Sequence, residues 1–243
     1  MSHPEAEFSL TGVAPSIAAV FGLPPLEQAA SAGITALCSS LGRRTRLALI
    51  VLDAFGVALW ENARRLTPYF NGLTEQHLVR LQSVRPPVTP VCFATLASGA
   101  LPEVHQVRDR RDELRAQTVF HLLRQADLKS AVVGRDSSSA RIVLSRFADY
   151  ARVAASNTDD EVLELSLQVV EQRSPHFLLV QFLDIDDSGH RHGPFSRETV
   201  EAIGLTDARL ARLGSFLTAR GYAFVVTADH GQHEPESTPG PGK

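Results

Sequence analysis

The sequence predicts an α/β fold in which a mainly parallel central sheet lies between two layers of helices, a three-layer α/β/α sandwich. Apolar segments of strand length alternate along the chain with longer segments that carry helix signals, which is typical of a parallel sheet covered by helices. Three of the four apolar segments are continuously hydrophobic, as expected for strands buried on both faces. A chain of 243 residues can bury one substantial core, so we expect residues 1–243 to form a single domain.

Four apolar segments are the expected strands. In chain order they are residues 47–52 (LALIVL), 131–134 (AVVG), 177–183 (FLLVQFL) and 222–227 (YAFVVT). Their lengths are usual for strands and short for a buried helix.

Helix signals lie between these strands. The expected helices are residues 118–128, 157–172 and 196–221. The second has Asn157 or Thr158 as its N-cap, followed by acidic residues that the helix dipole favours in a first turn. The third begins at the capping residue Ser196 and ends at Gly221. Gly204 is expected to bend or split this long helix.

Composition excludes several classes of protein. The chain is 44% hydrophobic and 21% charged, as in an ordinary globular protein, and its net charge of −3 favours neither nucleic acid nor an anionic membrane. Cys38 and Cys92 match no zinc or redox spacing, so we expect reduced thiols. The first residues lack the pattern of a signal peptide, and no apolar run approaches the roughly 18 residues of a membrane span. We therefore expect a cytoplasmic protein.

Acidic residues follow three of the four expected strands. They are Asp53 after the first, Asp184, Asp186 and Asp187 with His190 and His192 after the third, and Asp229 with His230 after the fourth. Taken alone, Asp53 is more simply explained as a helix N-cap. Ligands of parallel sheets bind beyond the carboxyl ends of the strands, and carboxylates crowded there repel one another unless a positive charge lies among them. Mixed Asp and His ligation suits Zn²⁺, Mn²⁺ or iron. These residues predict a metal site.

A candidate nucleophile precedes a short apolar helix that ends near Gly99. Thr89 lies between prolines at the expected start of this helix, where the helix N-terminus would stabilise negative charge on the hydroxyl and on a bound phosphoryl group. The alternative is that Thr89 is only an N-cap. Thr95 and Ser98 are competing hydroxyls, but they fall inside the helix.

Four elements in order along the chain resemble the alkaline phosphatase superfamily, and most closely its nucleotide pyrophosphatase/phosphodiesterase branch. They are Asp53, Thr89, the Asp186-x-x-x-His190 pair and the Asp229-His230 pair. TPVCFATLASGALPEVH is similar to the nucleophile segment of that branch, which implies that Thr89 is the nucleophile. DDSGHRHGP is similar to its Asp-Ser-Ser-Gly-His-x-x-Gly-Pro segment, which selects Asp186 as the ligand. TADHGQ is similar to the Asp-His-Gly element that the superfamily shares. The resemblance covers most of residues 46–234 and implies an alkaline phosphatase-like domain.

The resemblance also implies two divalent metal ions, Zn²⁺ or alternatively Mn²⁺, and a phosphothreonine intermediate. The implied ligands are Asp53, Thr89, Asp229 and His230 for one ion, and Asp186, His190 and a later histidine for the other. The last histidine is either His233 or a residue beyond Lys243, and the second alternative implies that the chain is C-terminally incomplete. We favour incompleteness, because His233 lies so close to His230 in the chain.

The sequence departs from the branch at one position near the nucleophile. Cys92 replaces the asparagine that contacts a phosphoryl oxygen three residues after the nucleophile in the branch. Cys92 is not in the Cys-x-Pro-x-Arg context of a sulfatase, so a sulfatase is disfavoured. Four arginines are candidates for binding substrate phosphate, with ordinary surface charge as the alternative: Arg85, Arg108, Arg135 and Arg191.

These observations predict a metal-dependent phosphohydrolase that acts on a small-molecule phosphate ester, phosphodiester or nucleotide-like substrate. One alternative is a phosphomutase of the same superfamily, in which the phosphoryl group returns to the substrate. The other is a degenerate binding module that keeps the fold without a complete set of ligands. The oligomeric state has no signal in the sequence.

Overall fold

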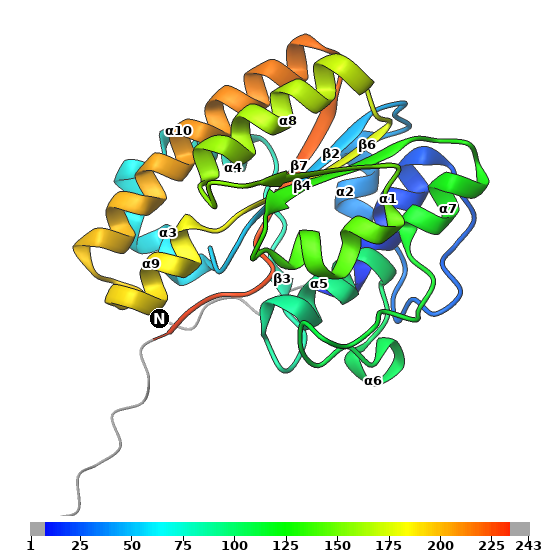
Figure 1. The fold of residues 1–243 in the computed structure, drawn as a ribbon, viewed down its shortest axis with the longest axis horizontal. Coiled ribbons are helices and arrows are strands. Elements are labelled where there is room, and N and C mark those ends of the chain that lie inside the picture. The colour runs from blue at the N-terminus through cyan, green and yellow to red at the C-terminus, as the bar shows by residue number, and fades with distance from the viewer. Residues whose placement is uncertain (1–7, 234–243) are drawn as a thin grey trace, which may run out of the picture.

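The computed structural model describes residues 8–233 and has a five-stranded, fully parallel sheet at its centre (Figure 1). The strand order is β5-β4-β6-β2-β7. The strands are β2 (Leu47–Leu52), β4 (Ser130–Arg135), β5 (Tyr150–Ala154), β6 (Phe177–Phe182) and β7 (Ala223–Thr227). A separate pair of very short parallel strands joins β1 (Phe8–Ser9) to β3 (Leu81–Gln82). β2 lies between β6 and β7, so three strands that were predicted to end in acidic residues are neighbours.

Helices cover both faces of this sheet and complete the predicted three-layer α/β/α sandwich (Figure 1). One layer contains α1 (Val13–Phe21), α2 (Thr35–Leu41), α5 (Thr89–Ser98) and α7 (Val119–Gln125). The other contains α3 (Val57–Ala63), α4 (Pro68–Gln76), α8 (Asp159–Arg173) and α10 (Arg197–Ala219). The short helices α6 (Pro102–His105) and α9 (Asp184–His192) lie near the ends of the sheet.

The core forms as two apolar layers, one on each face of the sheet. Leu47, Leu49 and Val51 of β2 pack with α1, α5 and α7, whereas the alternate residues Ala48 and Ile50 pack with α3, α8 and α10. Successive strand side chains point to opposite faces, so a strand covered on both faces is apolar at every position. This is why the central strands were visible in the sequence as continuous apolar runs.

The predicted strands are confirmed to within one or two residues, but β5 was missed. Its residues alternate between partly buried and exposed, and it forms one edge of the sheet, so its apolar signal is weak. The predicted helix starts are also confirmed. Thr158 and Ser196 are N-caps whose hydroxyl groups accept hydrogen bonds from the backbone N–H groups of Glu161 and Thr199.

Gly204 was expected to bend or split the third helix, and the split is wrong, because α10 is continuous from Arg197 to Ala219. The bend stays a prediction. A glycine inside a helix costs about 1 kcal/mol relative to alanine. α10 packs along α4, α8 and α9, and its buried leucines stabilise it by more than that cost. Among the described residues, none of the helices combines the length and apolarity needed to cross a membrane.

Candidate active site

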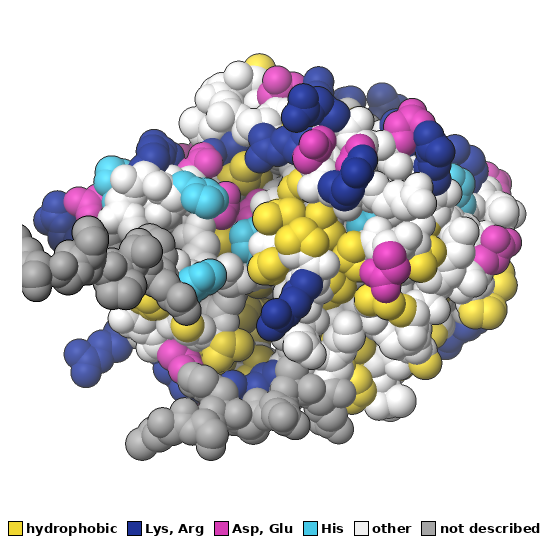
Figure 2. Space-filling view, turned by 90° about the horizontal axis from the view of Figure 1, so that it is seen from below, with side chains coloured by type: hydrophobic (Ala, Val, Ile, Leu, Met, Phe, Trp, Pro, Cys, Tyr) yellow, Lys and Arg dark blue, Asp and Glu magenta, His cyan; other side chains and the backbone are white. Residues whose placement is uncertain are grey.

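The sheet topology brings the carboxyl ends of β2, β6 and β7 together at one edge. Asp53 directly follows β2, Asp186 lies in the first turn of α9 after β6, and Asp229 lies two residues after β7. The strands are in register and parallel, with Leu52 opposite Phe182 and Val51 opposite Thr227, so all three chain segments leave the sheet on the same side. On the face seen from below Figure 1, histidine and acidic side chains lie close together beside an apolar surface (Figure 2).

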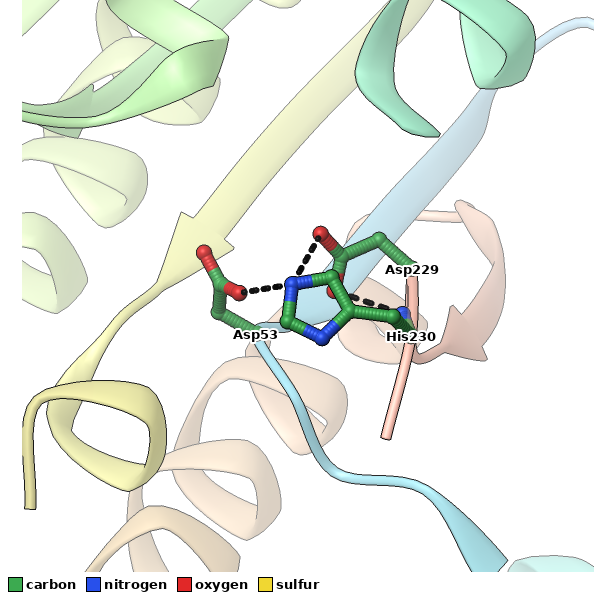
Figure 3. A group of neighbouring side chains, drawn as sticks. All are labelled: Asp53, Asp229 and His230. Carbon is green, nitrogen blue, oxygen red and sulfur yellow. Dashed lines mark hydrogen bonds and ion pairs between the residues drawn. The ribbon is translucent and has the colours of Figure 1, made fainter. Parts of the chain in front are cut away.

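Asp53, Asp229 and His230 form a compact cluster at this edge (Figure 3). One ligand atom from each residue lies within 4.8 Å of the others. The His230 Nε2 atom is 3.5 Å from Asp53 Oδ1 and 3.5 Å from Asp229 Oδ2. Both carboxylates are only 1% exposed. Among residues 8–233, this is the group of three such side chains whose ligand atoms lie close enough together to hold a metal ion.

Thr89 points into the same cluster. Its Oγ1 atom is 3.1 Å from His230 Nε2 and 3.4 Å from Asp53 Oδ1. Thr89 is the first residue of α5, Val88 is the N-cap, and no side-chain capping bond is formed. The Thr89 hydroxyl therefore faces the metal-ligand candidates and does not cap its own helix.

The hydroxyl groups of Thr95 and Ser98, the competing nucleophile candidates, form hydrogen bonds within the protein. Thr95 Oγ1 donates to the backbone oxygen of Ala100, and Ser98 Oγ donates to the backbone oxygen of Ala94. Both side chains are fully buried in α5. They stabilise the end of this helix, and neither is placed beside Asp53 or His230.

The electrostatics of the cluster call for a cation. Burial, followed by the charges of Asp229 and Asp186, raises the pKa of Asp53 well above its usual value. Burial likewise raises the pKa of Asp229 to about 7. Asp229 Oδ1 accepts hydrogen bonds from the backbone N–H groups of Ala54 and His230, but the buried Oδ2 has no hydrogen-bond partner. An unpartnered buried carboxylate oxygen beside an imidazole and a second carboxylate fits a divalent metal ion of the Zn²⁺ or Mn²⁺ type.

Gln181 is a site residue that the sequence reasoning missed. Its Nε2 atom donates to Asp53 Oδ2 at 2.5 Å, and its Oε1 atom accepts from the backbone N–H of Ala140 at 2.7 Å. The second bond fixes which end of the amide faces Asp53. Asp53 is therefore held with its other oxygen, Oδ1, toward Thr89 and His230. A polar residue inside the apolar run FLLVQFL was the available signal.

The second predicted ligand group is more open than the first. The His190 Nε2 atom lies 3.3 Å from Asp186 Oδ1, one turn away on α9, but the His190 side chain is 73% exposed. Asp186 Oδ1 also accepts a hydrogen bond of 2.7 Å from Gln232 Nε2. The charge of Asp186 raises the pKa of Asp53, so the two carboxylates are near enough to interact.

His233 is not brought to this group. It is exposed, and among residues 8–233 it has no hydrogen bond or ion pair with Asp186 or His190. Its neighbour Gln232 contacts Asp186 instead. The alternative ligand, a residue beyond Lys243, lies outside the described residues.

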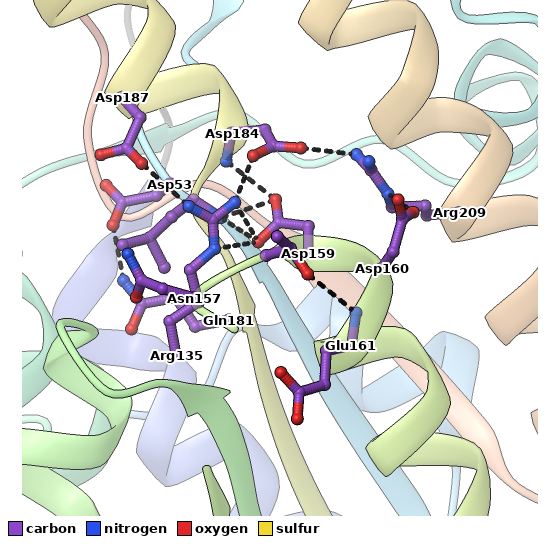
Figure 4. A network of polar contacts seen from close by, with 12 residues as sticks. Asp53, Arg135, Asn157, Asp159, Asp160, Glu161, Gln181, Asp184, Asp187 and Arg209 are labelled. Carbon is purple, nitrogen blue, oxygen red and sulfur yellow. Dashed lines mark hydrogen bonds and ion pairs between the residues drawn. The ribbon is translucent and has the colours of Figure 1, made fainter. Parts of the chain in front are cut away.

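Arg135 is not available to bind phosphate, contrary to its selection as a candidate (Figure 4). Its guanidinium group is buried and pairs with Asp159 at 2.8 Å, Asp187 at 2.8 Å and also Asp184. Asp159 in turn accepts hydrogen bonds from the backbone N–H groups of Leu183 and Asp184 at the start of α9. This network anchors the helix that carries Asp186 and His190.

The other arginine candidates lie at the surface. Arg108 pairs with Asp112, and Arg191 lies 3.7 Å from Asp187, so both have carboxylate partners outside the first cluster. Arg85 is exposed and precedes Pro86 in the loop before Thr89. Of the four arginines, Arg85 remains a candidate with no carboxylate partner among the described residues.

Cys92 lies beneath the cluster as a packed thiol. It is fully buried, its Sγ atom is 3.4 Å from Ser83 Oγ, and Ser83 donates to the backbone oxygen of Asp229. Burial, more than the nearby charge of Asp229, raises the pKa of the Cys92 thiol to about 12. The thiol is therefore neutral, and it supplies packing where the resembling branch has an amide.

A parallel three-layer sandwich with this Asp-His cluster beside a helix-terminal threonine is similar to the fold of the alkaline phosphatase superfamily. Comparison with known proteins confirms the resemblance to the nucleotide pyrophosphatase/phosphodiesterase branch of that superfamily. The family model described as type I phosphodiesterase/nucleotide pyrophosphatase matches residues 126–237. This match includes Asp186 and Asp229 but not Asp53 or Thr89.

Curated relatives and solved structures extend the match toward the N-terminus. Venom phosphodiesterase 2 and venom phosphodiesterase 1 of Crotalus adamanteus are each 26% identical over 238 residues, covering 86% of this chain and 29% and 28% of the relatives. Phosphonoacetate hydrolase from Sinorhizobium meliloti superposes with a TM-score of 0.62 at 21% identity, over 77% of this chain and 56% of that one. Murine ectonucleotide pyrophosphatase/phosphodiesterase 5 superposes with a TM-score of 0.60 at 18% identity, over 76% of this chain and 57% of that one. The chain thus spans under a third of its curated relatives.

Proposed function

We propose that this chain catalyses metal-dependent hydrolysis of a small-molecule phosphate ester or phosphodiester, with Thr89 as the nucleophile. The observation that carries the proposal is the position of the Thr89 hydroxyl, 3.1 Å from His230 Nε2 and 3.4 Å from Asp53 Oδ1 at the start of α5. A threonine hydroxyl is a weak nucleophile unless a base, a cation or both act on it. This one lies beside an imidazole and beside a carboxylate that could hold a cation.

Asp53, Asp229 and His230 would hold the first divalent ion, and Asp186 with His190 would contribute to a second. When bound, such ions offset the carboxylate charge, lower the pKa of a nearby hydroxyl and neutralise charge on the phosphoryl group. Gln181 and the backbone N–H groups of Ala54 and His230 keep the two buried carboxylates in place. Zn²⁺ is proposed first, and Mn²⁺ second, from the mixture of carboxylate and imidazole donors.

The proposed reaction has two steps, and each step forms one bond to phosphorus and breaks another. The Thr89 hydroxyl releases its proton to solvent as its oxygen forms a bond to phosphorus, and the ester oxygen departs with the bonding electron pair and takes up a proton from solvent. Water then forms a bond to phosphorus and loses a proton, while the Thr89 oxygen departs with the bonding electron pair and is protonated to restore the hydroxyl. The first backbone N–H groups of α5 lack intrahelical partners, so the positive end of this helix is suited to phosphoryl oxygens next to Thr89. The 3.1 Å contact places the Thr89 hydroxyl beside His230 Nε2, the atom that would hold the ion.

The substrate class is inferred from the relatives. The curated relatives are named phosphodiesterases, and the similar solved structures hold AMP in the murine protein and phosphonoacetate in the Sinorhizobium protein. AMP, phosphonoacetate and phosphodiesters all carry anionic oxygen atoms bonded to phosphorus. A small, nucleotide-like phosphate ester is therefore the substrate class that we propose.

The test is release of p-nitrophenol from bis(p-nitrophenyl) phosphate and p-nitrophenyl phosphate. The protein is first stripped with a chelator and then reloaded with Zn²⁺ or Mn²⁺. We expect metal-dependent turnover that Thr89→Ala abolishes and Thr89→Ser partly retains, because serine keeps the hydroxyl. Near wild-type activity of Thr89→Ala, or a covalent phosphate mapped to another residue, would contradict the proposal. Metal binding without any release of p-nitrophenol would favour the phosphomutase alternative.

A further inference from the structure

The helix α9, which carries Asp186 and His190, begins without a capping side chain of its own. Its N-cap is Leu183, whose side chain cannot accept a hydrogen bond. Asp159, the first residue of α8, takes this role from another part of the chain. Its carboxylate accepts hydrogen bonds from the backbone N–H groups of Leu183 at 2.9 Å and Asp184 at 2.8 Å. A fully buried carboxylate of a neighbouring helix therefore fixes the start of α9.

Arg135, the last residue of β4, joins this carboxylate to the side of α9 (Figure 4). Its side chain is 3% exposed and pairs with Asp159 at 2.8 Å, with Asp187 at 2.8 Å and also with Asp184. Asp184 has a second partner in Arg209 of α10, at 2.8 Å. A guanidinium group presents its N–H donors in a rigid planar fork. Two of the three carboxylates around Arg135 belong to α9, so these contacts restrict rotation of the helix about its axis.

The first turn of α9 contains three aspartates, and the network distinguishes between them. Asp184 and Asp187 are three residues apart and share the face that Arg135 contacts. Asp186 and His190 are four residues apart and share a different face, because a helix turns by about 100° per residue. Within the described part of the chain, the ion-pair partner of Asp186 is His190 and not an arginine. Asp186 is therefore the carboxylate of this turn whose charge is left for a cation.

We propose that Arg135 and Asp159 are positioning residues for the second ligand group. They fix the rotation of α9 so that Asp186 and His190 are held together beside the first cluster and bind an ion as a pair. This inference rests on the proposed function, since it assigns α9 to a site for two ions. Arg135 and Asp159 bind neither the ion nor the substrate, and they act through Asp186.

Stability alone is a weak reason for a buried charged network of this kind. Removing charged groups from water costs much of the free energy that their attraction returns, and well-packed apolar side chains often stabilise a protein as well. A fully bonded network differs from apolar packing in that it specifies one arrangement of its members. The arrangement specified here is the orientation of α9 relative to β4, α8 and α10.

Removal of the Arg135 charge gives a test whose sign separates positioning from electrostatics. A positive charge near a cation site repels the cation, so loss of this charge should by itself strengthen binding of the second ion. It would also leave Asp184 and Asp187 with fewer partners and more free charge. Positioning predicts the opposite sign. Arg135→Met should lower the affinity for the second ion by about tenfold and change the affinity for the first ion by less than about twofold.

Two measurements follow this variant. Calorimetric titration of the chelator-treated protein with Zn²⁺ resolves the two binding steps, and hydrogen exchange with mass spectrometry follows α9. We expect exchange that is faster by about tenfold or more in α9 and unchanged in β7. Neither measurement uses a substrate. Failure of the proposed function would appear separately, as a parent protein that binds ions but releases no p-nitrophenol.

Two further variants keep the test decisive if Arg135→Met does not fold, which circular dichroism shows. Arg135→Lys retains the buried charge but not the fork, so it should fold and lower the affinity for the second ion by a few-fold. Asp160→Asn is the matched control. Asp160 belongs to the same network through Arg209 at 2.7 Å, but its side chain is 77% exposed and lies on α8, so both affinities should stay unchanged.

The proposal fails on any of three results. The first is an affinity for the second ion that rises or stays the same in the Arg135 variants that fold. The second is an equal loss of affinity for both ions, which would indicate general loosening of the protein. The third is a parent protein that binds a single ion, because there would then be no second ion for α9 to position.

Discussion

The two predicted ligand groups use the same residue types but differ in how the fold holds them. Asp53 and Asp229 are buried, bonded to backbone or amide donors, and leave one carboxylate oxygen without a partner beside His230. Asp186 is bonded to Gln232, and its neighbour His190 is largely exposed. The ability to bind a metal ion therefore depends on more than the presence of acidic and histidine side chains. It also depends on their burial and on carboxylate oxygens that have no hydrogen-bond partner.

The largest expected effect separates these two groups directly. Asp229→Asn should lower the affinity for the most tightly bound divalent ion by about a hundredfold or more. The reason is that the substitution removes the charge of a buried ligand that has an unpartnered oxygen. Asp186→Asn should weaken the same ion by less than about tenfold. Calorimetric titration of chelator-treated protein with Zn²⁺ measures both. Equal losses in the two variants would remove the distinction between the groups.

The next effect is the pH dependence of stability without metal. The pKa of Asp229 is raised from 3.8 to about 7 in the folded protein. Below about pH 4 the carboxyl is protonated in both the folded and unfolded states, and the stability contributed by its raised pKa is complete. Between about pH 4 and 7 the unfolded chain releases this proton first, so the free energy of unfolding falls as the pH rises, by an amount on the order of 2–4 kcal/mol.

Urea unfolding of the chelator-treated protein at several pH values checks this prediction. Asp229→Asn should reduce the pH dependence, because it removes one of the two buried carboxyl groups whose pKa is raised. Saturating Zn²⁺ should reverse the trend near pH 7, because the ion binds the deprotonated carboxylates of the folded state. A metal-free protein that becomes more stable between pH 4 and 7 would contradict the assignment.

A smaller effect is expected from Gln181, which supports only the first group. Gln181→Leu should weaken the tightest ion by about tenfold, since Asp53 loses the donor that orients it and no ligand is removed. Gln181→Glu is a second variant of similar size that replaces the donor with a like charge, and it should weaken binding further. Both are compared with the parent by the same Zn²⁺ titration. Unchanged affinity in both variants would leave Gln181 with a packing role alone.

The smallest effect is expected at the second group. Gln232→Ala frees Asp186 Oδ1 from its hydrogen bond and should strengthen binding of a second ion by a few-fold, or about 1 kcal/mol. His233→Ala is the matched control and should change nothing, because His233 does not contact this group within the described residues. Elemental analysis gives the stoichiometry. Two tightly bound ions in the parent that fall to one in His233→Ala would establish His233 as the missing ligand.

Much of this arrangement could be predicted because it depends on local sequence. Continuous apolar runs identified the buried strands, and the acidic residues that follow them identified the edge at which Asp53, Asp186 and Asp229 lie. Both cysteines are free thiols, in agreement with the expected absence of a disulfide. The cytoplasmic location inferred partly from them stays a prediction.

By itself, the sequence determined the class of fold, the edge that carries the site and the candidate nucleophile. These follow from side-chain periodicity and from the order of residues along single strands. Only the tertiary structure decided which polar atoms have protein partners. Arg135 is paired with three carboxylates, Asp186 Oδ1 is bonded to Gln232, and Asp53 Oδ2 is bonded to Gln181. The physical reason is that each of these contacts joins segments far apart in the chain. Their partners depend on how strands and helices pack, and no short stretch of sequence contains both members of a pair.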